Sequence, residues 1–487
     1  MKTFLAALAV IASLGASAAP LGYGDARHLL DRAGFGATDR EVREFAALDR
    51  AAAVDRLLEG ARRTAATRPP AFVDDPIERP GRLKDREARK ALLAKLRAQG
   101  LQLRAWWIGE MLGTPSPLTE RMTLFWHNHF ATSQRKVRSP QLMYRQNVLL
   151  RREALGNFAT LLHAVAKDPA MLVYLDNARS RRGAPNENFA REVMELFTLG
   201  VGRYGERDVK EAARAFTGWS VDPASGAYRY RPFFHDGGEK TVLGEHGALD
   251  GDQVLDILLA RPETARFIAA KLWREFVSPT PDEAEVERWA QVFRAAHYEM
   301  KPLLRAMFLS DAFWARENRA SLVKSPVDVV VGTLRTFEIR PADLRPAAVT
   351  CAFLGQDLFG PPNVKGWPGG DAWIDSATLL GRRQFVDRVF RASAGAHIPA
   401  VREASMRVGD ARAEEGGRGG HLRRLMARGM GDYSFDGARW MRTLGAAPDA
   451  RIDRLVLATA PVDALTARVG TAERVRGLVA DAAYQLK

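Results

Sequence analysis

Two histidines stand two residues apart in the segment FWHNHF, at His127 and His129. Imidazole is the commonest transition-metal ligand of proteins and a frequent general base. On a regular helix, residues two apart point about 200° away from each other, so the two rings converge only if the helix ends after Trp126. The pair therefore predicts one of two arrangements. In the first, both histidines form a catalytic site that holds a divalent metal ion; in the second, one histidine lies in the core and the other on the surface.

Carboxylates follow in the segment NENFAREVMELFTL. Asn188, Glu192 and Glu195 are spaced i, i+4 and i+7, so they share one face of a helix whose other positions are mostly apolar. A partly buried carboxylate beside a histidine can act as a general acid or base. If the partners are arginines or lysines instead, the same carboxylates form a structural ion-pair network. Both interpretations stay open at this point.

Several basic and amide side chains are candidates for binding an anion. Arg179 precedes a helix that Asn186 is expected to cap, and a helix N-terminus attracts negative charge. His235 stands at the DGG turn of an expected hairpin and is a further catalytic candidate, while Trp367 in the loop GPPNVKGWPGG offers an indole for stacking. The alternatives are a solvated basic loop, ordinary turn chemistry and a buried tryptophan. The predicted substrate-binding residues are Arg179, Asn186, Asn188, Lys240, Asn363, Lys365 and Trp367.

The elements that must position these residues are mainly helices. Apolar residues recur at helical spacing along most of the chain, and Ser-Pro, Asp-Pro and Asn caps mark several helix starts. The pattern predicts a mostly α fold, with one large multi-helix globular domain and a small β-hairpin insertion. The predicted divisions are a signal peptide at 1–18, a main domain at 19–408, a flexible linker at 409–420 and a C-terminal helical extension at 421–487. Within the main domain, 63–83 is an expected extended connector and 227–243 the expected hairpin.

The first residues indicate where the protein works. Lys2, an apolar run and the small residues before Ala18 form the three-part pattern of a secretory signal, with cleavage expected after Ala18. We expect a periplasmic or secreted bacterial protein with no transmembrane segment in the mature chain. The formal charge of +14, from 72 Lys and Arg against 58 Asp and Glu, then favours envelope anions over nucleic acid. The alternative is an ordinary solvated surface from an organism with arginine-rich proteins. Cys351, the single cysteine, lies in an apolar stretch and is expected to be a small buried hydrophobic residue.

Several segments together resemble a known bacterial family. They are HLLDRAGFGAT, MTLFWHNHFATS, the run from Lys167 to Trp219, FHDGGEKTVLG, TARFIAAKLWREFVS and LGQDLFGPPNVKGWPGG. This combination is similar to the family called domain of unknown function 1800. The resemblance implies a secreted, helical protein that is often encoded beside a second exported family, one similar to alkaline phosphatases and sulfatases. It carries no catalytic residues over to this chain.

These observations favour an exported hydrolase that acts on an anionic envelope or extracellular substrate. His127 or His129 is expected as base or metal ligand, and Glu192 or Glu195 as acid, base or supporting partner. Arg179 and Lys365 are expected as anion clamps. The competing hypothesis is a non-catalytic accessory protein that binds an exported sulfatase-like partner through an exposed apolar patch.

Overall fold

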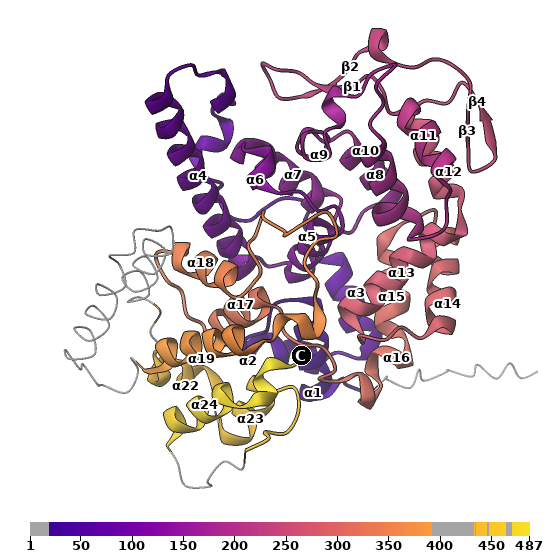
Figure 1. Ribbon diagram of the computed structural model, residues 1–487. Helices are drawn as coiled ribbons and strands as arrows, with labels where there is room; N and C mark the ends of the chain where they lie inside the picture. The colour runs from indigo at the N-terminus through magenta and orange to yellow at the C-terminus, as the bar shows by residue number, and fades with distance from the viewer. Residues whose placement is uncertain (1–18, 392–432, 434, 446–447, 464–469) are drawn as a thin grey trace, which may run out of the picture.

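The protein is mostly helical. The computed structural model describes residues 19–391, 433, 435–445, 448–463 and 470–487. Helices account for most of these residues, and the strands among them form two small two-stranded sheets (Figure 1). The prediction of a mostly α fold with a small β insertion is confirmed. The predicted signal peptide at 1–18 and the predicted linker at 409–420 lie outside the described residues.

The first four helices lie between Gly22 and Gly113. Thr38 and Glu41 form a capping box, in which the Thr38 hydroxyl accepts from the Glu41 amide at 3.2 Å and the Glu41 carboxylate accepts from the Thr38 amide at 2.8 Å. The connector at 63–83 holds two short 3-10 turns, Ala71–Asp74 and Pro80–Arg82. The four helices are α1 (Gly22–Ala33), α2 (Asp39–Ala46), α3 (Arg50–Glu59) and α4 (Arg86–Gly113).

The next group of helices carries most of the candidate residues. The helix that Asn186 caps begins and ends as expected, with Gly200 as its stop at a φ of +86°. After Val193, however, the chain continues as a π-helix, which the pattern of apolar residues does not distinguish from an α-helix. The elements are α5 (Pro117–His129), α6 (Gln134–Val137), α7 (Pro140–Arg152), α8 (Phe158–Ala166), α9 (Pro169–Tyr174), η3 (Asn177–Arg179), α10 (Glu187–Glu192), the π-helix η4 (Val193–Leu199) and α11 (Glu206–Ala215).

The strands pair differently from the expected hairpin. β2 (Tyr228–Tyr230) pairs with β1 (Trp219–Val221), and β3 (Lys240–Val242) pairs with β4 (Glu245–Gly247), both antiparallel. The expected pairing of the two ends of 227–243 is therefore corrected. The reason is the short 3-10 helix η5 (Pro232–Phe234), in which Pro232 has no amide hydrogen to continue a ladder.

The second half of the chain is again helical. Asp250 caps α12 through its side chain, as the sequence suggests. Among the described residues, no helix is both long and apolar enough to cross a membrane. The remaining elements are α12 (Gly251–Ala260), α13 (Pro262–Phe276), α14 (Glu283–Ala295), α15 (Met300–Leu309), α16 (Asp311–Trp314), η6 (Arg316–Asn318), α17 (Pro326–Thr336), α18 (Arg345–Phe353), η7 (Gly370–Trp373), α19 (Ser376–Arg391), α22 (Gly437–Leu444), α23 (Pro448–Val456), α24 (Thr471–Ala480) and η9 (Ala482–Gln485).

The C-terminal helices share the core of the main domain. In Figure 1 the yellow α23 lies against the indigo α1, although more than four hundred residues separate them. The Tyr484 hydroxyl lies 2.7 Å from that of Thr333, and Leu486 pairs with Val323 in an isolated antiparallel bridge. Tyr484 and Leu486 are therefore packed into the same fold as the main domain.

A buried ion network joins the ends of the chain. Asp328 on α17 accepts hydrogen bonds from Arg121 of α5 and, at 2.9 Å, from the Lys487 ammonium. Arg121 also donates to the Gly34 carbonyl and lies 3.4 Å from Glu275 of α13. Burial alone would raise the pKa of Asp328, but the two cations hold that pKa well below its ordinary value. The Asp328 carboxylate is thus ionised, and it accepts hydrogen bonds from both cations.

We expect Asp328→Asn to lower the free energy of unfolding by about 3–5 kcal/mol, because it leaves Arg121 and Lys487 buried without their counter-ion. Since the pKa of Asp328 is depressed in the folded state, its stabilisation is present above the unfolded pKa of about 3.9 and is lost as the pH falls below it. Chemical unfolding at neutral and acid pH measures both effects. As a control, Asp311→Asn at a fully exposed position should change stability by less than about 0.5 kcal/mol.

Candidate functional site

His127 lies near the C-terminal end of α5, inside an aromatic cage. Its ring centroid is 5.5 Å from those of Trp107 and Phe359, and 5.6 Å from that of Trp367. Burial, with a smaller contribution from the charge of Arg104, lowers the pKa of His127 to about 3. The imidazole is therefore neutral across the physiological range.

His129 points to the other side of the same helix end. Its Nδ1 accepts a hydrogen bond from the Lys271 Nζ at 2.9 Å, and its Nε2–H then faces the Phe197 carbonyl at 3.2 Å. Burial lowers the pKa of His129 and also lowers that of Lys271, to about 8. The result is a neutral imidazole beside an amine that loses its proton more readily than an ordinary lysine.

The two histidines do not converge. They have different ring neighbours, because residues two apart on an intact helix face opposite sides. Among the described residues, no group of three or more His, Cys, Asp or Glu side chains could hold a metal ion together. The regular helix extends to His129 and does not end after Trp126, so the condition for a shared ion is not met.

The carboxylates lie where α10 becomes the π-helix η4. Glu192 is half-buried, and its pKa is raised first by burial and then by the neighbouring charge of Glu195, while Lys365 acts in the opposite sense. Glu195 accepts a hydrogen bond from the Tyr204 hydroxyl. π-Helical turns are rare and are frequently found at functional sites. Glu192 is thus a carboxyl group that holds its proton more tightly than usual, although the charge of Lys365 opposes this effect.

Tyr174 interacts electrostatically with this carboxylate pair. The pKa of Tyr174 on α9 is raised first by burial and then by the charge of Glu192. The Lys136 ammonium lies 5.7 Å from the centre of the Tyr174 ring and 2.6 Å from the carboxylate of Asp176. Lys136 is therefore a second cation next to Tyr174, and its charge is paired with that of Asp176.

The loop that carries Lys365 is attached to the end of α5. The Trp367 amide donates to Asn128 Oδ1 at 2.6 Å, and Asn363 Oδ1 accepts from the Lys365 amide at 2.8 Å to form a tight turn. Gly366 has a φ of +83°, and a Cβ there would lie 2.2 Å from Asn128 Oδ1. In Figure 1 this orange loop crosses in front of α5. Only glycine allows so close an approach.

Trp367 does not offer an exposed stacking surface. Its side chain is buried, with 4% of its surface accessible, and its ring packs against that of His127. Among the described residues, neither Trp367 Nε1 nor His127 Nε2 has a hydrogen-bond partner. Buried polar atoms without partners are rare and costly, so finding two on adjacent rings sets this region apart from ordinary core packing.

The remaining predicted residues stand outside this cluster. Asn186 has a local structural role, because its Oδ1 accepts from the Phe189 amide and its Nδ2 donates to the Leu175 carbonyl at 2.8 Å. Asn188 and Arg179 are exposed. Arg179 belongs to a basic loop that packs beside β1, and not to the end of α5.

His235 and Lys240 belong to the base of the β insertion. His235 Nδ1 lies 3.0 Å from the Thr217 carbonyl, and its ring packs against Tyr230. Lys240 is buried, and its ammonium donates to the carbonyls of Asp236 and Gly238 at 2.6 and 2.8 Å. Its donors are used inside the loop, so the predicted role of Lys240 in binding substrate is not supported by its position.

Some members of the site were not singled out from the sequence. Lys271 and Tyr204 come from other elements and have no local motif that points to the histidine or carboxylates. Asn128 does have a signal, because it stands between the two histidines of FWHNHF. Helical geometry predicts that Asn128 points in a different direction from both histidines, but not that its partner is the loop that holds Trp367.

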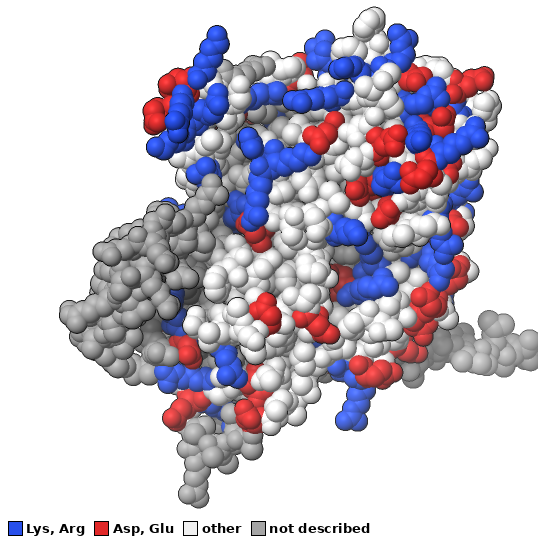
Figure 2. Space-filling model, viewed as in Figure 1, with Lys and Arg blue, Asp and Glu red and all other residues white. Residues whose placement is uncertain are grey.

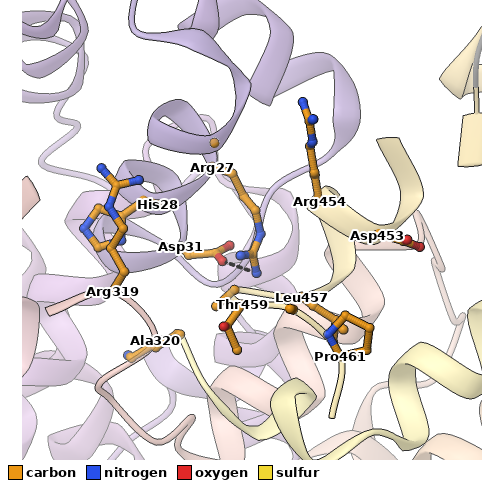
Figure 3. A pocket seen from close by; sticks show the side chains of 14 residues that line it. Arg27, His28, Asp31, Arg319, Ala320, Asp453, Arg454, Leu457, Thr459 and Pro461 are labelled. Carbon is orange, nitrogen blue, oxygen red and sulfur yellow. Dashed lines mark ion pairs between the residues drawn. The ribbon is translucent and has the colours of Figure 1, made fainter. Parts of the chain in front are cut away.

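A separate cavity of about 250 Å³ lies between α1 and the chain after α23. Figure 3 shows Arg27 and Asp31 in its centre, joined by an ion pair of 2.6 Å, with His28 and Arg319 on one wall. Arg319 pairs with Asp25 at 2.7 Å, and burial lowers the pKa of His28 to about 3. The charges of Arg27, Asp31 and Arg319 already neutralise one another or a neighbour, which indicates a mainly structural role for this cavity.

We expect Gly366→Ala to displace the loop from α5, because the added Cβ collides with Asn128. The matched control is Gly369→Ala, which has a similar φ of +71° but nothing within 4 Å of the added Cβ. Both variants carry backbone strain, so Gly366→Ala should cost about 1–3 kcal/mol more in the free energy of unfolding, the range of a steric overlap. Equal losses for the two variants would show that the contact does not hold the loop.

We expect Glu192→Gln to raise the melting temperature at pH 7. The pKa of Glu192 is raised in the folded state, so ionisation at neutral pH destabilises that state relative to the unfolded chain. Below the ordinary glutamate pKa of about 4.3 both states are protonated, and the difference should vanish. Glu59→Gln, at an exposed position on α3, serves as the control. A drop in melting temperature for Glu192→Gln at pH 7 would contradict this account.

The chain matches a known protein family over most of its length. No curated protein and no solved structure matches the chain. The sequence profile of a family described as "Protein of unknown function (DUF1800)" matches residues 28–478, more than nine-tenths of the chain. This span includes the end of α5, the carboxylate helix and the Lys365 loop. The chain therefore belongs to the DUF1800 family of proteins of unknown function.

Proposed function

We propose that the protein is a hydrolase for an anionic substrate and that Glu192 is its acid–base group. The observation that carries the proposal is the environment of Glu192, a half-buried carboxyl whose pKa is raised by burial and by Glu195, against the opposite effect of the charge of Lys365. A raised pKa suits a general acid, because proton transfer is most efficient when the pKa of the acid lies near the working pH. Perturbed carboxyl pairs of this kind are typical of sites that transfer protons.

Glu195 and Lys365 have different roles beside Glu192. Glu195 stays engaged with the Tyr204 hydroxyl and supplies the charge that helps Glu192 to keep its proton. Lys365, on the exposed turn of its loop, provides positive charge for a substrate anion next to the carboxyl. In this arrangement Glu192 donates a proton to the leaving group, and the resulting carboxylate can then take a proton from the attacking water.

The histidines position this site and do not contact the substrate. Both rings are enclosed by aromatic side chains, which leaves neither His127 nor His129 in reach of a substrate that binds at Glu192. His129 instead fixes the end of the π-helix through the Phe197 carbonyl, and His127 packs against the anchor of the Lys365 loop. We therefore place both among the positioning residues and leave the metal ion out of the proposed reaction.

We also propose that the protein acts outside the cytoplasm. The first 18 residues have the pattern of a cleaved signal peptide, and the net charge of +14 suits the anionic groups of the bacterial envelope. The competing proposal is a non-catalytic accessory protein for an exported sulfatase-like partner. It predicts binding without turnover, so a direct assay separates the two.

The test is hydrolysis of 4-nitrophenyl phosphate, sulfate and glucuronide by the purified mature chain. We expect turnover of at least one ester or glycoside, and a loss of about 10²- to 10⁴-fold in kcat/KM for Glu192→Gln, the usual contribution of a general acid. The wild-type rate should fall as the pH rises above the pKa of Glu192, because the acid form is then lost. Lys365→Ala should mainly raise KM.

Glu59→Gln is the matched control and should retain the wild-type rate. Full activity of Glu192→Gln would overturn the assignment of the acid. No turnover of any of the three compounds would favour the accessory protein over the hydrolase.

A further inference from the structure

The segment that joins β2 to β3 forms an aromatic apex. Of the eight large hydrophobic residues that are exposed in the described chain, three lie within five positions: Tyr230, Phe233 and Phe234, with 42%, 83% and 37% of their surface accessible. In Figure 1 this segment projects from the top of the molecule, above β1 and β2. Clustered exposure of this kind marks an interaction site, whereas isolated exposed apolar residues do not.

The apex is held rigidly in its exposed position. The Arg182 amide donates to the Phe234 carbonyl at 2.7 Å, and the Arg231 amide donates to the Gly218 carbonyl at 2.8 Å. At the base of the loop, Asp236 accepts two hydrogen bonds from the Arg214 guanidinium, at 2.9 and 3.1 Å. The exposure of Phe233 is therefore built into the loop and does not reflect a loose end.

Positive charge surrounds the aromatic side chains. The stretches 177–184 and 227–235 contain five arginines and no Asp or Glu, and the first stretch is joined to the second by the Arg182–Phe234 hydrogen bond. The nearby acidic residue Asp222 pairs with Arg229 at 3.4 Å. Figure 2 shows basic side chains on both sides of the uncharged tip. The arginines are Arg179, Arg181, Arg182, Arg229 and Arg231, all exposed except the half-buried Arg231.

We propose that this apex docks onto the surface of an anionic phospholipid bilayer. Phe233 enters the boundary between headgroups and acyl chains, and the flanking arginines contact lipid phosphates. Phenylalanine has no hydrogen-bonding group, so Phe233 suits an acyl boundary better than a sugar, for which tryptophan and tyrosine are the usual partners. Arginines on both sides of a projecting apolar tip match a plane of negative charge. The inference is independent of the proposed hydrolase.

The experiment is sedimentation of the full mature chain with vesicles. We expect binding to vesicles of phosphatidylglycerol and phosphatidylcholine in equal parts, and little binding to phosphatidylcholine alone. Phe233→Ser should weaken binding about ten-fold, the effect of removing one buried aromatic side chain from the interface. Arg181→Gln should weaken it about five-fold, and high salt should weaken it further.

The control is Val462→Ser, which removes an apolar side chain with 72% of its surface accessible, in the segment that follows α23. In Figure 1, α23 lies at the opposite end of the molecule from β1 and β2. Its binding should match that of the wild type. Equal binding to both kinds of vesicle, or unchanged binding of Phe233→Ser, would overturn the proposal. So would Phe233-dependent binding to an immobilised acidic polysaccharide in the absence of vesicle binding.

Discussion

The contact between Arg121 and Asp328 is the interaction on which the arrangement of the molecule depends. Through it, α5 is tied to α17, to the Gly34 carbonyl after α1, to Glu275 of α13 and to Lys487. Because these charges are buried, each needs its partners in place, and no segment of the network can shift without leaving an uncompensated charge. The network therefore fixes the position of α5, and with it everything that α5 carries at its other end.

That other end organises the candidate site. Within three consecutive residues, α5 presents His127 to the aromatic cage, Asn128 to the Lys365 loop and His129 to the π-helix and Lys271. A helix turns by about 100° per residue, so three neighbours can address three separate elements. The chemistry proposed for Glu192 thus depends on a helix that contributes none of the reacting groups.

Sequence reasoning identified many residues of this site, but it placed the two histidines at the centre instead of Glu192. The caps at Thr38, Asn186 and Asp250 and the stop at Gly200 were predictable, because each depends on a few neighbouring residues. The nearness of Glu192 and Lys365 was expected, yet no local pattern could show that Asn128 holds the loop, since that contact joins residues 239 apart in sequence. The π-helix and the pairing of β2 with β1 were missed for the same reason. Both are decided by tertiary packing.

The burial of Lys487 bears on where the chain can be shortened. Its ammonium neutralises Asp328 in the core, and its main chain is hydrogen-bonded to Leu322. A recombinant version that stopped before Lys487 would leave Asp328 with one cation fewer and the Leu322 carbonyl without its partner. Removing this one residue would therefore remove part of the core.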